Sequence, residues 1–115
     1  MMDLTRNEEG PVTVIRVAGE IDQEGVNALR VGLLNCLKDK RWHVVVDLSE
    51  VRYVSYMAVG VLLERRRQLI AGGGDLKLAG LNLVVKRTFH MASVTGMFSI
   101  YDTIAQARDG FKAAA

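Results

Sequence analysis

The strongest constraint on the fold is a strand that leads directly into a helix between Val44 and Leu63. Three consecutive valines at 44–46 are typical of a buried central strand, and Asp47, Leu48 and Ser49 are predicted to close it. A second break at Ser55 begins a helix with an apolar face. Such a turn places the N–H groups of the helix N-terminus at the carboxyl edge of a sheet. A functional site is therefore expected first at this turn.

The rest of the chain alternates between strand and helix patterns. Apolar periodicity predicts strands at 12–18, 76–79 and 98–101, and helices from about 23 to 41, from 57 to 70, from 83 to 91 and up to 111. This order predicts an α/β fold with a mixed, mainly parallel sheet of four to five strands and about four helices. Residues 3–9 are predicted to add an antiparallel edge strand. We expect one domain over 1–115, with its core at about 12–111.

Composition excludes several classes of function. The net charge of +2 is small and no basic block is interleaved with aromatic residues, so nucleic acid is not an expected partner. The single cysteine, Cys36, rules out an internal disulfide. The first ten residues have no apolar core, and no apolar run approaches the ~18 residues of a membrane span. These features predict a cytoplasmic protein with no membrane insertion.

The residue types that usually bind cofactors or metals are not arranged for that purpose. The glycines at 72–74 follow a helix instead of preceding one, so they predict a helix cap and not a phosphate loop. His43 and His90 have no second histidine or cysteine at metal-ligand spacing, and Cys36 lies among leucines. We therefore expect no metal and no cofactor.

Acidic residues follow two of the predicted strands. Glu20 and Asp22 end one strand, and Asp47 and Glu50 end the next. Because the carboxyl ends of parallel strands share an edge, these acids could cluster and support acid–base or metal chemistry. The reading we favour is that they are cap and turn residues.

Three segments resemble the STAS domain family, which includes anti-sigma-factor antagonists and the cytoplasmic tails of sulfate transporters. They read GEID at 19–22, DLSEVRYVS at 47–55 and LAGLNLVVKRTFHMA at 78–92. The resemblance covers roughly 12–111. It implies a mixed sheet flanked by helices on one side, and a binding module without catalytic activity of its own.

The antagonist branch of that family carries a switch in the loop before the second main helix. The loop typically reads Asp-Ser-Ser-Gly-Leu-Gly, and a partner kinase phosphorylates its second serine. Placed on this chain, the motif aligns its Asp with Ser55, its first serine with Tyr56 and its acceptor serine with Met57. Ala58 takes the place of the first glycine, and Gly60 alone is retained. Since methionine has no hydroxyl, the resemblance implies a site whose phosphorylation switch is missing.

Two alternatives remain open for the side chains of this loop. Ser55 could be phosphorylated in place of the missing serine, but an N-cap is the favoured role. Tyr53, Tyr56 and Met57 either contact a protein partner or fold back onto the core of the domain. The residues predicted to bind a partner are Glu20, Asp22, Tyr53, Ser55, Tyr56, Met57 and Ala58.

The resemblance implies a non-enzymatic regulatory module in a bacterial signalling pathway. The expected partner is an anti-sigma factor that is also a serine kinase, or a related regulator, bound through residues 53–60. The alternative is a STAS-like accessory subunit of a transporter ATPase of the lipid-transport type. Self-association into a homodimer is left open. An enzyme using Glu20, Asp22 and Asp47 is the least favoured reading, because no nucleophile or cofactor motif accompanies them.

Overall fold

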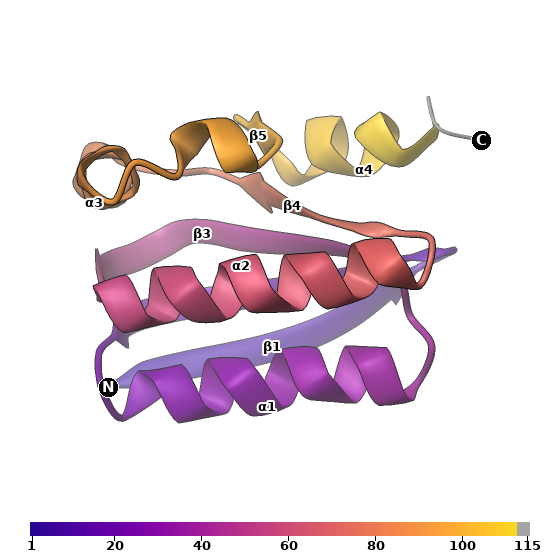
Figure 1. Cartoon of the computed structure of the whole chain (residues 1–115), viewed down its shortest axis with the longest axis horizontal. Coiled ribbons are helices and arrows are strands. Elements are labelled where there is room, and N and C mark those ends of the chain that lie inside the picture. Colours follow the sequence, from indigo (N-terminus) through magenta and orange to yellow (C-terminus); the bar gives the residue numbers. More distant parts are fainter. Residues whose placement is uncertain (113–115) are drawn as a thin grey trace.

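The computed structural model describes residues 1–112 and shows a five-stranded sheet with four α-helices (Figure 1). In chain order the elements are β1 (Met2–Glu9), β2 (Val12–Ile21), α1 (Gly25–Lys38), β3 (His43–Val54), α2 (Tyr56–Ala71), β4 (Asp75–Ala79), α3 (Leu83–Met91), the short 3-10 helix η1 (Thr95–Met97), β5 (Ile100–Tyr101) and α4 (Ile104–Lys112). The predicted succession of strands and helices is confirmed.

The sheet is mixed and mainly parallel. Its strands lie in the order β1-β2-β3-β4-β5, with β1 antiparallel to β2 and every other pair parallel. The polar segment at the start of the chain thus forms the predicted antiparallel edge. Its side chains alternate between partly buried and exposed, as expected for an edge strand with one face toward solvent.

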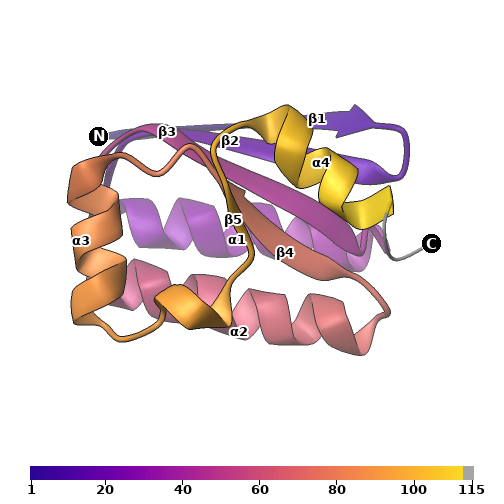
Figure 2. The same cartoon turned by 90° about the horizontal axis from the view of Figure 1, so that it is seen from above.

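Helices cover both faces of the sheet, which corrects the expectation of helices on one side only. Val44 and Val46 of β3 belong to the large core that also contains buried residues of α1, α2 and α3. Val45 points to the opposite face, where it packs with Ala107 of α4 in a smaller cluster. Figure 2 shows α4 across the sheet from α1 and α2. The valine run at 44–46 is therefore buried from two sides.

β3 is longer than predicted, because residues 47–49 do not close it. The strand continues to Val54, and its register against β2 shifts twice. From Asp47 to Glu50 β3 advances by three residues, while its partner β2 advances by two, from Arg16 to Ala18. One extra residue on one strand is the signature of a β-bulge. The Asp47 side chain is buried and accepts a hydrogen bond from the Ser49 N–H at 3.0 Å. β2 likewise runs through the predicted break at Gly19 and ends at Ile21.

The three glycines at 72–74 end α2, as predicted. Gly73 has a φ of +95°, a left-handed conformation that favours glycine. Gly72 and Gly74 have a different reason for lacking a side chain. A Cβ at Gly72 would lie 2.2 Å from the Trp42 ring, and one at Gly74 would lie 1.9 Å from the Trp42 carbonyl oxygen. The tryptophan therefore fills the space that the glycines leave.

Candidate functional site

The start of α2 has the geometry expected of a capped helix at a sheet edge. Ser55 has extended backbone angles, and its Oγ accepts a hydrogen bond from the Ala58 N–H at 3.1 Å. The Ser55 N–H donates to the Ile21 carbonyl at 3.0 Å, which ties the turn to the end of β2. The predicted N-cap is thus confirmed, and it stands where β2 and β3 both end.

Three side chains around this cap project into solvent. Tyr53, Tyr56 and Met57 are 50%, 59% and 54% exposed, so they do not fold back onto the core. We call these three residues the loop surface. Ala58, which was expected to contact a partner, is fully buried. Its side chain cannot reach a partner, and its part in the site is the N–H that binds Ser55.

Glu20 and Asp22 border the loop surface from the end of β2. Glu20 lies opposite Tyr53 in the β2–β3 register, and its Oε2 is 3.8 Å from a guanidinium nitrogen of Arg52. Asp22 has a local structural role, since its Oδ1 accepts the N–H groups of Gly25 at 2.9 Å and Glu24 at 3.1 Å. The bond from Gly25 is the main cause that lowers the Asp22 pKa. α1 begins at Gly25, two residues later than predicted.

The acidic cluster, which was the less favoured alternative, does not form within the part of the chain that the structure describes. Asp47 lies within β3, paired with Arg16, well before the edge where Glu20 and Asp22 are found. Among residues 1–112, no group of three His, Cys, Asp or Glu side chains is placed to hold a metal ion. β3 continues beyond Asp47 to Val54, which places Asp47 inside the strand and not at its end. The two pairs of acids therefore do not share one edge.

Two apolar residues next to the loop surface were not predicted as part of it. Leu83 is 79% exposed and Val84 is also exposed, while Val85 is the residue of the three that is buried. Asn82 fixes the start of α3 beside β3, because its Nδ2 donates to the Val51 carbonyl at 2.6 Å while its Oδ1 caps the helix. Three consecutive apolar residues exceed one face of a helix, and that pattern could have indicated the exposure.

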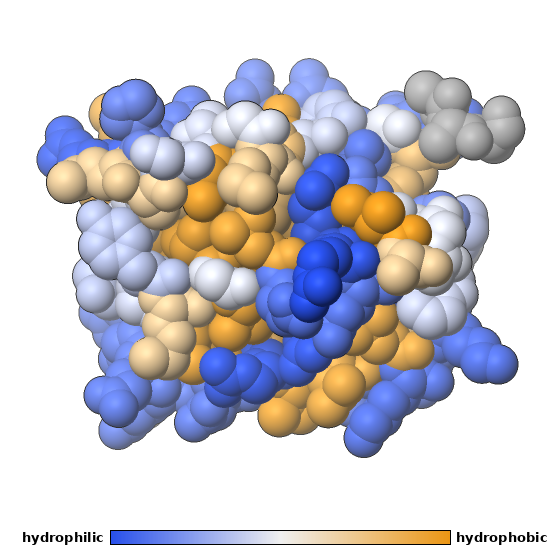
Figure 3. Space-filling view, in the orientation of Figure 1, coloured by the Kyte–Doolittle hydropathy of each residue, from blue (hydrophilic) through white to orange (hydrophobic). Residues whose placement is uncertain are grey.

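The exposed side of α2 offers bare backbone at Gly60. A Cβ at this position would meet nothing within 4 Å, so packing inside the chain does not require a glycine there. Gly60 borders two hollows, one of about 290 Å³ toward α1 and one of about 340 Å³ toward η1. Figure 3 shows hydrophobic residues in the floor of the recess between α2 and the α3–η1 segment. A partner could approach the helix closely at this point.

The other residues considered from the sequence do not join the site. Cys36 is buried in the core, and burial raises the pKa of its thiol. The ring of His43 lies 5.0 Å from that of Phe111, centroid to centroid, at the opposite end of β3. His90 is exposed near the end of α3. None of the helices within residues 1–112 has the length and apolar character needed to cross a membrane.

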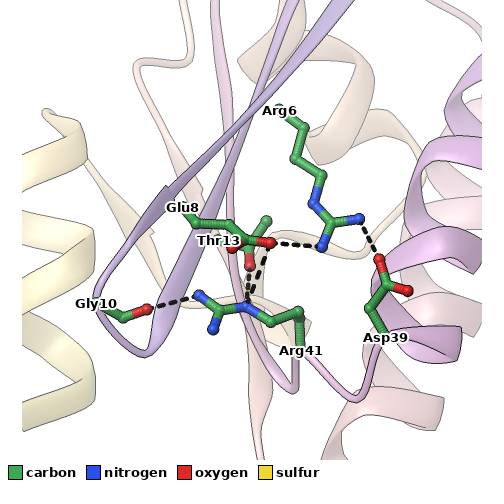
Figure 4. A network of polar contacts seen from close by, with 6 residues as sticks. All are labelled: Arg6, Glu8, Gly10, Thr13, Asp39 and Arg41. Atoms are coloured by element: carbon green, nitrogen blue, oxygen red, sulfur yellow. Dashed lines mark hydrogen bonds and ion pairs between the residues drawn. The ribbon is translucent and has the colours of Figure 1, made fainter.

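At the far end of β3, polar groups bind one another (Figure 4). Arg41 donates from Nε to the buried hydroxyl of Thr13 at 2.8 Å and from a terminal nitrogen to the Gly10 carbonyl at 2.6 Å. Arg6 bridges Glu8 and Asp39, each at 2.8 Å. These contacts join the β1–β2 turn to the segment between α1 and β3. Their role is structural.

The family model of the STAS domain matches residues 3–107. The chain belongs to the STAS domain family. An anti-sigma F factor antagonist of Paenibacillus polymyxa is 24% identical to it over 92 residues, which cover 79% of each chain. The capped helix start and the exposed loop surface are thus features of a STAS domain that is similar to anti-sigma-factor antagonists.

Solved structures share this fold closely. An anti-sigma factor antagonist from Mycobacterium paratuberculosis superposes with a TM-score of 0.89 at 21% identity, covering 97% of this chain and 95% of that one. The unphosphorylated form of the antagonist SpoIIAA gives a TM-score of 0.84 at 20% identity, covering 96% and 97%. The phosphorylated form of SpoIIAA, a Bacillus cell fate determinant, gives a TM-score of 0.74 at 21% identity, covering 93% of this chain and 97% of that one.

Proposed function

We propose that this STAS domain is a regulatory binding module that contacts an anti-sigma kinase, or a related regulator, through the loop surface. The observation that carries the proposal is the exposure of Tyr53, Tyr56 and Met57 around the capped start of α2. Tyrosine and methionine are enriched in the cores of protein interfaces. Three such side chains held on a rigid strand end and a capped helix form a prepared contact surface.

The contact is proposed to work without a phosphorylation switch at position 57. SpoIIAA exists in a phosphorylated and an unphosphorylated form, so that relative of the chain has an acceptor. Here the aligned acceptor position holds Met57, which has no hydroxyl. The nearest hydroxyl is that of Ser55, and it is engaged in capping α2. The domain would therefore stay competent to bind whatever the kinase activity of its partner.

A surface that needs no phosphate also suits the second candidate, an accessory subunit of a transporter ATPase. The exposed Leu83 and Val84 favour this candidate in one respect, because they widen the apolar contact beyond the loop. A larger apolar area is typical of a permanent complex. The two candidates differ in the partner bound, and in neither does the domain carry out chemistry.

The first test measures binding to a purified anti-sigma kinase by isothermal titration calorimetry, with and without ATP. We expect equal affinity in both conditions. Tyr56→Ala and Met57→Ala should each weaken binding by about tenfold or more, because buried aromatic and apolar anchors dominate interface energy. Met91→Ala is the matched control, since Met91 is exposed on α3 outside the site. No binding to any such kinase, with capture by a transporter ATPase instead, would support the second candidate.

A second test restores the acceptor. Met57→Ser places a hydroxyl in the first turn of α2, where added negative charge is favourable. With kinase and ATP, mass spectrometry should find phosphate on Met57→Ser and none on the wild type. Phosphate on Ser55 of the wild type, accompanied by loss of the complex, would contradict a binding mode without a switch.

A further inference from the structure

A cavity of about 690 Å³ lies at the end of the molecule away from the loop surface. It is open on one side and is lined by the β1–β2 turn, the start of β3, the glycine turn after α2 and the last turn of α4. Figure 2 shows the end of α4 beside that turn. The volume falls in the range of small-molecule sites, about 300–1,000 Å³. The proposed partner contact does not use this space.

The cavity has an apolar wall formed by different parts of the chain. Pro11 and Val12 line it from the turn and β2, and the ring of Phe111 lines it from α4. Phe111 is held in place by His43 on one side and by Lys77, whose Nζ lies 5.0 Å from the centre of the ring. A wall that contains a proline and an aromatic ring held by its neighbours is suited to an apolar ligand of limited size.

The ionisable groups along the lining are Glu9, His43, Arg108 and Lys112. Glu9 and Arg108 pair with each other and compensate each other's charge. Lys112 is 3.4 Å from Asp109, and both side chains are exposed, so this pair is weak and the ammonium can be shared. The Lys112 ammonium is therefore the group at the rim that can exchange its present partner for a ligand carboxylate. His43 Nδ1 is buried and has no hydrogen-bond partner within residues 1–112, which leaves one polar atom of the lining unused by the fold.

We propose that this cavity binds a small amphipathic carboxylic acid. The hydrocarbon part lies against Pro11, Val12 and Phe111, and the carboxylate lies at the rim toward Lys112. The proposal depends on the apolar wall and on the Lys112 ammonium at the rim, whose exposed pair with Asp109 is weak. It does not rest on the proposed partner contact, because the two surfaces lie at opposite ends of β3.

The test uses sodium octanoate as the probe and 1-octanol as its neutral counterpart. In ¹⁵N-resolved NMR titrations of the full chain, octanoate should produce saturable shifts of the amides of Val12, His43 and Phe111. 1-Octanol should bind to the same residues about fivefold more weakly, which is the effect expected of one exposed ion pair. Shifts that do not saturate, or that gather around Tyr56 and Gly60, would overturn the proposal.

Charge reversal at the rim gives the decisive variant. Lys112→Glu should lower the affinity for octanoate about fivefold and leave the affinity for 1-octanol unchanged. Lys86→Glu is the matched control, because it makes the same charge change at an exposed lysine of α3 and should alter neither probe. If both variants lower the affinity for octanoate equally, the effect comes from the net charge of the protein and the assigned site is wrong. Partner binding measured on Lys112→Glu should equal that of the wild type, so failure here leaves the proposed function standing.

Discussion

The two ends of β3 differ in how their side chains are satisfied. The strand begins among charged side chains that are paired within the chain and ends beside aromatic side chains that are exposed. Near His43 the charged side chains bind one another or a buried hydroxyl, as Arg41 does with Thr13 and Gly10 (Figure 4). Near Val54 the apolar side chains of Tyr53 and Tyr56 remain uncovered. The first arrangement satisfies hydrogen bonds within the chain, and the second leaves hydrophobic area available to another molecule.

The difference separates stability from binding along one strand. Substitutions near the start of β3 should lower the free energy of unfolding and leave the loop surface intact. Substitutions around the start of α2 should weaken partner binding at little cost in stability. The N-terminus of α2 contributes to both stability and binding, because the Ser55 cap stabilises the helix and also holds the exposed residues in position.

The largest effect is expected from Arg41→Ala. This change leaves the fully buried Thr13 hydroxyl without its partner at 2.8 Å and the Gly10 carbonyl without its own at 2.6 Å. Removing one partner of a buried polar group costs about 1–3 kcal/mol, and more when a charge is involved. We expect the free energy of unfolding to fall by about 2–3 kcal/mol in urea denaturation, with partner affinity of the folded protein unchanged.

Arg67→Ala is the control for that loss. Arg67 pairs with Glu64 at 2.6 Å, but both side chains are exposed on α2. Such a pair contributes about 0.2–1 kcal/mol at most. If Arg41→Ala and Arg67→Ala destabilised the protein equally, the hydrogen bonds of Arg41 would contribute no more to stability than an exposed ion pair.

A smaller effect is expected from Ser55→Ala. The change removes the oxygen that accepts the Ala58 N–H, and loss of an N-cap costs about 1 kcal/mol. Thermal unfolding should show this loss, and Ser55→Asp should restore stability because a carboxylate also caps. If Ser55→Asp instead abolished partner binding while remaining folded, Ser55 would be a regulatory site as well as a cap.

Local signals in the sequence predicted the boundaries of α2 and α3 well, whereas α1 spans Gly25–Lys38 and not the predicted 23–41. α3 begins at Leu83 and ends at Met91 as expected, because Asn82 is a strong cap followed by a regular helical pattern. α2 begins after Ser55 for the same reason. Caps act through hydrogen bonds to residues two or three positions away, so they can be recognised in a single sequence.

Features that depend on distant segments could not be predicted in this way. Asp47 and Ser49 have the residue types of a turn, yet pairing with β2 continues on both sides of them, with a bulge between Asp47 and Glu50. β4 pairs with β3 only as far as Asp47. The helical pattern of α4 shows which of its faces is apolar but not which side of the sheet that face covers. The sequence located the loop at 53–60, whereas the exposure of Met57 and Leu83 depends on what α1, α3 and β2 leave uncovered.

A small gain in stability, and the sharpest separation of the two roles, is expected from Gly60→Ala. Since the added Cβ meets nothing within 4 Å, the variant should be more stable by about 0.5–1 kcal/mol, the helix propensity of alanine over glycine. The same methyl group should weaken partner binding if a partner approaches the α2 backbone between the two hollows. Gly110→Ala is the opposite case, because its Cβ would lie 2.4 Å from the Tyr101 hydroxyl and should destabilise α4. A stabilised Gly60→Ala with full affinity would place the contact away from the α2 backbone at Gly60 and confine it to Tyr53, the first turn of α2 and the start of α3.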